Sequence, residues 1–136
     1  MYWLAGRLRG VRVCCGDWKR VVSPCVLFVA TPCAVFLDPP YSIETGRYPS
    51  CYAVDDLGVA HKVREWALQW GEDLRLRIAL CGYEGEHDMP PSWECVEWKA
   101  VGGYSNQSTD GDNSNRYRER IWFSPHCLSG LQGELF

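Results

Sequence analysis

Short apolar runs, each ended by glycine, proline or aspartate, recur along this chain and predict a series of short strands. Val11 to Cys15 is a short run of residues typical of a strand, and two apolar runs, Cys33 to Leu37 and Leu76 to Cys81, predict buried strands. The continuous run at Cys33 to Leu37 predicts a strand that is buried on both faces. Two further strands are predicted at Trp93 to Lys99 and at Arg120 to Phe123.

One long helix is predicted between the second and third of these strands. Asp55-Asp56 has the residue type of a helix N-cap, and Gly71 ends the apolar periodicity that follows it. The apolar positions with helical spacing are Val59, Ala60, Val63, Trp66, Ala67 and Trp70. A short helix is also predicted at Trp3 to Arg9, and loops at Ser42 to Tyr52 and at Gly102 to Asn115.

This order of elements predicts an α/β fold with a mainly parallel sheet, formed as a single domain by residues 1–136. In such sheets, ligands bind outside the carboxyl ends of the strands. Three chemically interesting turns follow predicted strands: Asp17, Asp38 and Tyr83-Glu84. We therefore expect these turns to converge on one edge of the sheet, where they would form a site.

Composition bears on three questions: contact with nucleic acid, metal binding and cellular location. The 136 residues carry a formal net charge of −3, so contact with a nucleic acid requires a local basic patch. The eight cysteines include no Cys-x-x-Cys pair, which disfavours a structural zinc site and predicts no metal. Reduced thiols, the lack of a signal peptide and the lack of a transmembrane run predict a cytoplasmic protein, without membrane contact.

The sequence Asp38-Pro39-Pro40-Tyr41 is the strongest candidate for chemistry. A strand delivers the carboxylate to the sheet edge, and two prolines stiffen the backbone that follows. Fixed acceptors beside an aromatic ring suit a planar amine such as the amino group of a nucleobase. The alternative is a strand end with a Pro-Pro turn and a solvated aspartate.

Phe36-Leu37-Asp38-Pro39-Pro40-Tyr41 resembles motif IV of the DNA N6-adenine methyltransferases, in particular those of phages and prophages. The segments Arg77 to Gly85 and Glu119 to Pro125 are similar to the same enzymes. The resemblance implies a Rossmann-like, S-adenosylmethionine-dependent fold whose mainly parallel sheet ends in an antiparallel hairpin. It also implies methyl transfer to adenine in the DNA of a bacterial host, as in restriction-modification. Asp38 and the Pro39 carbonyl would then hold the amino group, and Tyr41 would stack on a flipped-out adenine.

The resemblance implies roles for other residues too. Val11 to Asp17 is similar to the third strand of that fold, which places Asp17 and Trp18 beside the cofactor; a simple turn aspartate is the alternative. Tyr104 would face the target base, with an exposed loop aromatic as the alternative. Lys99, Arg116, Arg118 and Arg120 flank this loop and would contact phosphates, or form a solvated basic face.

One feature of that family has no counterpart in the sequence. No Phe-x-Gly-x-Gly segment precedes Val11, so the chain resembles a truncated catalytic domain that begins at the third strand. The edge this leaves predicts a rearranged sheet, a second chain or self-association. Three functions stay open: a DNA adenine methyltransferase, an RNA guanine-N2 methyltransferase, and a non-catalytic remnant or nucleic-acid-binding protein.

Overall fold

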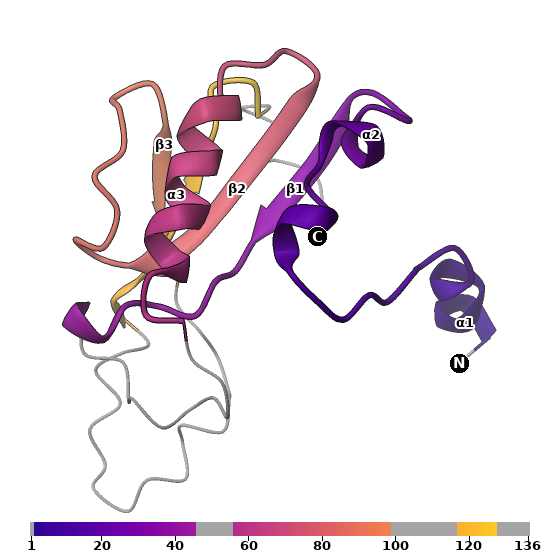
Figure 1. The fold of residues 1–136 in the computed structure, drawn as a ribbon, viewed down its shortest axis with the longest axis horizontal. Helices are drawn as coiled ribbons and strands as arrows, with labels where there is room; N and C mark the ends of the chain where they lie inside the picture. Colours follow the sequence, from indigo (N-terminus) through magenta and orange to yellow (C-terminus); the bar gives the residue numbers. More distant parts are fainter. Residues whose placement is uncertain (1, 46–55, 99–116, 128–136) are drawn as a thin grey trace, which may run out of the picture.

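A computed structural model describes residues 2–45, 56–98 and 117–127, in which four strands form one open sheet. The strands are β1 (Cys33–Leu37), β2 (Leu76–Tyr83), β3 (Glu94–Glu97) and β4 (Glu119–Phe123). Their order across the sheet is β1-β2-β4-β3, so β1 and β3 are the edge strands (Figure 1).

The directions of the strands define a mixed sheet. β1 and β2 are parallel, in a register that pairs Cys33 with Leu76 and Leu37 with Leu80. β4 runs antiparallel to both of its neighbours, β2 and β3, so that β1, β2 and β3 share one direction. The predicted α/β class is therefore confirmed in its general form, as a mixed α/β arrangement with a parallel pair and an antiparallel hairpin.

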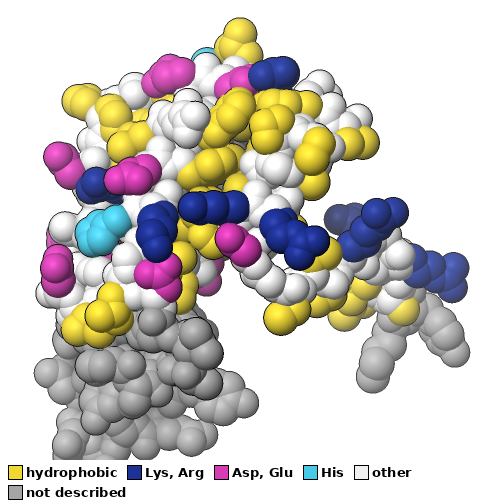
Figure 2. Space-filling view, in the orientation of Figure 1, with side chains coloured by type: hydrophobic (Ala, Val, Ile, Leu, Met, Phe, Trp, Pro, Cys, Tyr) yellow, Lys and Arg dark blue, Asp and Glu magenta, His cyan; other side chains and the backbone are white. Residues whose placement is uncertain are grey.

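The helices are short except for the crossover between β1 and β2. They are α1 (Tyr2–Leu8), η1 (Trp18–Arg20), α2 (Pro24–Leu27), η2 (Ile43–Thr45) and α3 (Val59–Trp70). In Figure 1, α3 and α2 lie over the same face of the sheet, whereas α1 stands apart from it. Lys and Arg side chains gather along the part of the chain that leads to α1 (Figure 2).

The core lies between this helical face and the two inner strands. Leu76, Ile78 and Leu80 of β2 are fully buried, and they pack in one cluster with Val63 and Ala67 of α3. Alternate side chains of β2 and the apolar side of α3 therefore pack against each other in one layer. Burial of these side chains from water supplies the main driving force for folding.

Gly71 is required at the end of α3 by close packing. Its φ of −63° is open to any residue, but a Cβ atom there would lie 2.4 Å from the Trp93 indole ring. Trp93 is itself 6% exposed and belongs to the core cluster. The predicted end of the helix is thus confirmed, and the physical reason is that only glycine lets this ring pack on the helix terminus.

Two predictions about strands are wrong. Residues Val11 to Cys15 form no strand, because no other strand lies beside them to supply ladder hydrogen bonds; the Val13 side chain is 95% exposed. β1 has the predicted bounds but is buried on one face only, since the Phe36 side chain is 65% exposed. β1 is an edge strand with helices on one side, and within residues 2–45, 56–98 and 117–127 no other element covers its second face or its outer edge.

Several predicted bounds shift by a few residues. α3 has Gly58 as its N-cap, and Asp56 instead accepts a hydrogen bond from the Gly58 amide and pairs with Lys62. β2 continues through Gly82 to Tyr83, where a Cβ atom on Gly82 would lie 2.7 Å from the His87 ring. The helix predicted near the N-terminus is confirmed as α1. The loop predicted at 102–115 lies outside the described residues.

Within the described ranges, no helix has the length and apolar character needed to cross a membrane.

His87 is a buried histidine whose surroundings favour the neutral ring. Its Nε2 lies 3.1 Å from the Cys81 carbonyl oxygen, and its ring packs against Trp122 with centroids 5.1 Å apart. Nδ1 is buried and has no hydrogen-bond partner among the residues that the structure describes, so a proton there would be unsatisfied. Burial lowers the pKa of His87 below its ordinary 6.5.

We predict that His87 makes the fold less stable in mild acid. Below pH 6.5 the unfolded chain binds a proton at this position that the folded chain does not bind, so unfolding becomes more favourable as the pH falls. Urea denaturation at about pH 7.5 and about pH 5.5 should show wild type losing up to about 1.4 kcal/mol per pH unit relative to His87→Gln. Parallel pH dependences for the two proteins would contradict this account.

Candidate functional site at the carboxyl end of β1

Asp38-Pro39-Pro40-Tyr41 follows directly on the last residue of β1. The prolines end the strand because a proline has no amide hydrogen for the ladder. Pro39 is buried and Pro40 is half-buried, whereas Asp38 is exposed at the carboxyl end of the strand. The predicted position of the motif, at a strand terminus with an accessible carboxylate, is confirmed.

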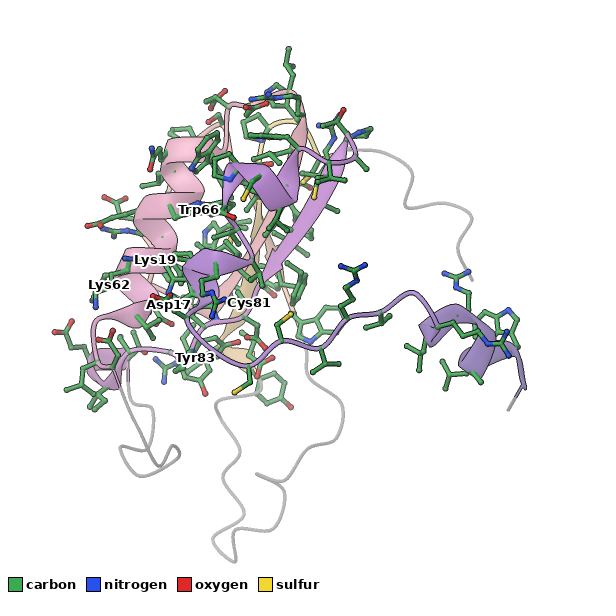
Figure 3. The ribbon with its side chains drawn as sticks, turned by 45° about the vertical axis from the view of Figure 1, so that its right-hand side comes forward. Asp17, Lys19, Lys62, Trp66, Cys81 and Tyr83 are labelled. Carbon is green, nitrogen blue, oxygen red and sulfur yellow. The ribbon has the colours of Figure 1, made fainter. Side chains whose placement is uncertain are left out.

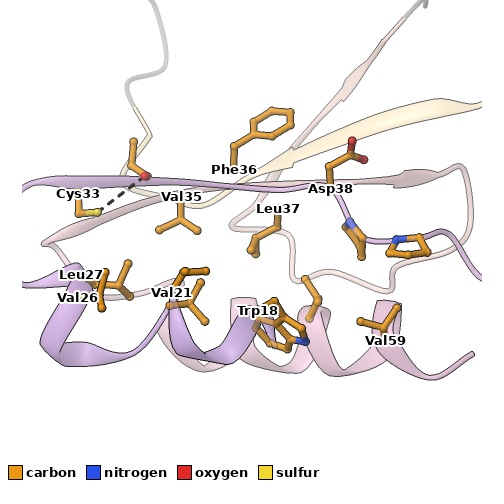
Figure 4. Close-up of a pocket in the computed structure, with 15 residues that line it drawn as sticks. Trp18, Val21, Val26, Leu27, Cys33, Val35, Phe36, Leu37, Asp38 and Val59 are labelled. Carbon is orange, nitrogen blue, oxygen red and sulfur yellow. Dashed lines mark hydrogen bonds between the residues drawn. The ribbon is translucent and has the colours of Figure 1, made fainter. Parts of the chain in front are cut away.

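Asp38 and Tyr41 line a cavity of about 270 Å³. Phe36 and Asp38 lie on the opposite side of β1 from Val35 and Leu37, so the cavity belongs to the sheet face that α3 leaves open (Figure 4). The other lining residues come from the neighbouring strands and their ends: Phe36, Cys81, Trp98, Glu119, Arg120 and Ile121. Two carboxylates, a guanidinium group and aromatic rings thus lie around a space on the face of the sheet opposite α3.

The buried carboxylate of Glu86 holds the segment after the motif against the end of β2. Its Oε1 accepts a hydrogen bond of 2.6 Å from the Ser42 amide, and its Oε2 accepts one of 2.8 Å from the Tyr83 amide. Glu86 is 7% exposed and Ser42 is 5% exposed. Hydrogen bonds to an ionised acceptor in such a place are short and strong, so this clamp fixes the chain immediately beyond Tyr41.

Tyr41 is held by a stack of side chains at the ends of β2 and β4. Its ring meets the Tyr83 ring edge-on, with centroids 4.5 Å apart and planes at 65°. The guanidinium of Arg118 lies 4.9 Å from the centre of the Tyr83 ring and donates a hydrogen bond of 2.7 Å to the Thr45 carbonyl oxygen. Arg118, which we predicted to contact phosphate, therefore braces the loop that carries Tyr41.

The cavity favours protonated forms of its titratable side chains. Burial, with a smaller effect of the Asp38 charge, raises the pKa of the Tyr41 hydroxyl. The same two causes raise the pKa of the Cys81 thiol to about 12, so this thiol is not a nucleophile near neutral pH. Burial and then the Asp38 charge also raise the pKa of Glu119.

A second and larger hollow, of about 520 Å³, lies on the helical side of β1. Val26, Leu27 and Cys33 lie at one end of it, and Asp38 and Val59 lie at the other (Figure 4). Among the described residues that line it, Asp38 is the one that carries a charge, and the others are apolar apart from the indole of Trp18. We call this hollow the β1 groove.

The two residues predicted to contact the cofactor separate in the structure. Trp18 lines the β1 groove and packs edge-on against Trp66, with centroids 6.4 Å apart. Asp17 is exposed, and its carboxylate accepts a hydrogen bond from the Lys19 amide as the N-cap of η1. Figure 3 shows Asp17 and Lys19 on the side of α3. The observed contact of Asp17 is therefore that of a turn aspartate.

Not all predicted residues can be placed, and sequence reasoning missed others. Tyr104, Lys99 and Arg116 lie outside the described residues. Glu119 was not predicted as part of the site, although its strand position opposite Tyr83 would have placed it there had the pairing been known. Arg120 is buried and lines the cavity, and its guanidinium pairs with Glu84 at 3.1 Å and Glu97 at 3.6 Å.

In the parts of the chain that the structure describes, no group of three or more His, Cys, Asp or Glu side chains has the arrangement of a metal site.

A search against protein-family models found no match to the chain, and neither curated proteins nor solved structures gave a significant match. The function is therefore argued from the chemistry of the cavity and its surroundings.

We predict that Glu86→Gln loosens the site. A glutamine can accept only one of the two amide hydrogens that Glu86 accepts, and it turns an NH₂ group toward the other donor. The free energy of unfolding in urea should fall by about 2 kcal/mol. Glu65→Gln, an exposed change of the same type on α3, serves as the control and should leave stability within about 0.5 kcal/mol of wild type. If Glu86→Gln and Glu65→Gln had the same free energy of unfolding, the two hydrogen bonds of Glu86 would not stabilise the fold as stated.

Proposed function

We propose that this chain transfers a methyl group from S-adenosylmethionine to the N6 amino group of adenine in DNA. The observation that carries the proposal is that Asp38 and Tyr41, from one tetrapeptide, open into a single cavity with Glu119. The cavity lies at the carboxyl end of a parallel strand, where α/β sheets bind ligands. The resemblance implies a mainly parallel sheet that ends in an antiparallel hairpin, and the described strands include one parallel pair and such a hairpin.

Asp38 and Tyr41 have separate tasks in this proposal. The Asp38 carboxylate and the Pro39 carbonyl accept hydrogen bonds from the adenine amino group, which orients the amine and raises its electron density. Tyr41 stacks on the face of a base that has left the duplex. Because Tyr83 and the Glu86 clamp hold this segment, Tyr41 is positioned before the base enters.

Glu119 completes the chemistry as the proton acceptor. S-adenosylmethionine, when bound, supplies an electrophilic methyl group. On transfer, the methyl carbon would exchange its bond to sulfur for a bond to the adenine nitrogen, and that nitrogen would have one proton to release. Glu119 shares the cavity with Asp38, and its raised pKa makes its carboxylate a better base than an exposed one.

The residues that the structure describes suit one part of the cofactor. The carboxyl end of the β1 groove joins the indole of Trp18 to Asp38 and the two prolines, which suits the flat, weakly polar adenine ring of the cofactor. The methionine end of the cofactor is charged, and Asp38 is the one charged side chain among the described residues of the groove lining. The proposal therefore assigns only the adenine end to this groove.

We predict that Asp38→Ala lowers the transfer of a radiolabelled methyl group to DNA by about 10²-fold or more. Tyr41→Phe should retain most of the activity, whereas Tyr41→Ala should lower it because the stacking surface is lost. Asp88→Ala, at an exposed aspartate outside the cavity, is the matched control. Structured RNA serves as the competing substrate, and labelling of RNA in preference to DNA would overturn the choice of adenine in DNA.

We predict that Glu119→Gln lowers kcat by about 10²-fold with little change in KM, because it removes a base without removing a contact to the resting substrate. In wild type, transfer should fall as the pH drops through the raised pKa of Glu119, since the carboxyl group then keeps its own proton. The variant should lack this acid limb. The exposed Glu94→Gln change is the control, and a wild-type pH profile in Glu119→Gln would exclude Glu119 as the base.

A further inference from the structure

β1 is an edge strand of the sheet formed by the described residues. β1 is the first strand in the order β1-β2-β4-β3, so one row of its amide and carbonyl groups has no partner strand in the described part of the chain. The β1 groove runs along the helical side of this same strand, with the side chains of Cys33, Val35 and Leu37 turned into it (Figure 4). An apolar edge of this kind is a template for another strand.

The chain itself contains a segment of matching pattern. Residues 2–16, which we call the N-terminal arm, include α1 and the stretch Val11 to Cys15, in which apolar Val11, Val13 and Cys15 alternate with Arg12 and Cys14. Val13 is 95% exposed and Val11 is 57% exposed, although both have high strand propensity. A five-residue strand of this pattern would place three apolar side chains on one face, toward a groove.

Charge favours the same pairing. The arm, residues 2–16, carries three basic side chains and no acidic one, a formal charge of +3, whereas residues 17–136 carry eleven basic and seventeen acidic ones, a formal charge of −6. The arm's arginines are exposed, and Lys and Arg side chains gather along it in Figure 2. Opposite charges on the two parts of one chain make the arm of one copy complementary to the body of another.

The arm does not cover the edge of its own sheet. From Asp17 it leads away from β1 to α1, which stands apart from the rest of the chain (Figure 1). Val11 to Cys15 is in neither a helix nor a strand, and Gly10 and Gly16 flank it, the latter with a φ of 149°. Glycines at both ends let the segment change direction as a unit.

We propose that the free edge of β1 is a docking site for the arm of a second copy of this chain, with the two copies exchanging arms. Val11 to Cys15 adds a strand beside β1, with its valines in the β1 groove against Val26 and Val35. Arg12 then lies on the opposite face, the face of Phe36 and Asp38. Reciprocal exchange covers both edges and closes the assembly as a dimer. The carboxyl end of the groove, at Trp18 and Pro40, stays open, and the inference does not depend on the proposed function.

Sedimentation velocity over a range of concentrations tests the exchange with the full chain. Wild type should sediment as a dimer at micromolar concentration. Val13→Asp, in the arm, and Val26→Asp, in the groove, should each weaken self-association by roughly tenfold or more, because each places a charge in the apolar contact. Val29→Asp is the matched control, since Val29 is 82% exposed and does not line the groove, and it should associate as wild type does.

Cross-linking separates exchange from folding back within one chain. Equal amounts of ¹⁴N and ¹⁵N wild type are mixed, treated with a short bismaleimide and digested for mass spectrometry. Links between the arm cysteines, Cys14 or Cys15, and Cys33 should join peptides of different isotope. Links within one isotope only would overturn the proposal. So would a monomer at all concentrations. Binding of an added oligonucleotide that blocks cross-linking of the arm cysteines, without dimer formation, would also overturn it.

Discussion

The buried carboxylate of Glu86 is the interaction on which the candidate site depends. It accepts hydrogen bonds from the amides of Ser42 and Tyr83, and so joins the segment after Tyr41 to the end of β2. Asp38 and Tyr41 otherwise follow β1, a five-residue edge strand, and the clamp adds a tie to an inner strand of the sheet. The clamp fixes the proline-rich end of β1 beside the cavity. The Tyr83 ring packs against Tyr41, and the Arg118 guanidinium packs on the Tyr83 ring, which holds the same segment further.

The sequence predicted the elements whose patterns are local. The apolar run at Cys33 to Leu37 and the helical spacing from Val59 to Trp70 both match the structure, because each pattern reflects burial along a single element. Val11 to Cys15 has the same local pattern but no strand, since a strand forms only where a neighbour supplies its hydrogen bonds. The exposed face of β1 was missed for the same reason: burial depends on which elements lie beside it.

The candidate site was predictable only in part. Asp38 and Tyr41 carry a recognisable motif, and they do line one cavity. Glu119 joins them through the register of β2 and β4, and Glu86 through a contact with Ser42 across 44 positions of sequence; no local pattern reports either. Asp17 shows the opposite case, because a turn aspartate caps the next helix by a local hydrogen bond whether or not it has any other role.

The central claim is that the cavity at Asp38 and Tyr41 receives an adenine base, and NMR titration of the isotope-labelled chain with adenosine tests it most directly. The account predicts saturable chemical-shift changes concentrated at Asp38, Tyr41, Cys81 and Glu119, with guanosine binding more weakly. Such changes do not require the cofactor or a particular DNA sequence, so they report on the cavity alone. Shifts confined to the N-terminal arm, or no saturable change at any of the four residues, would contradict the claim.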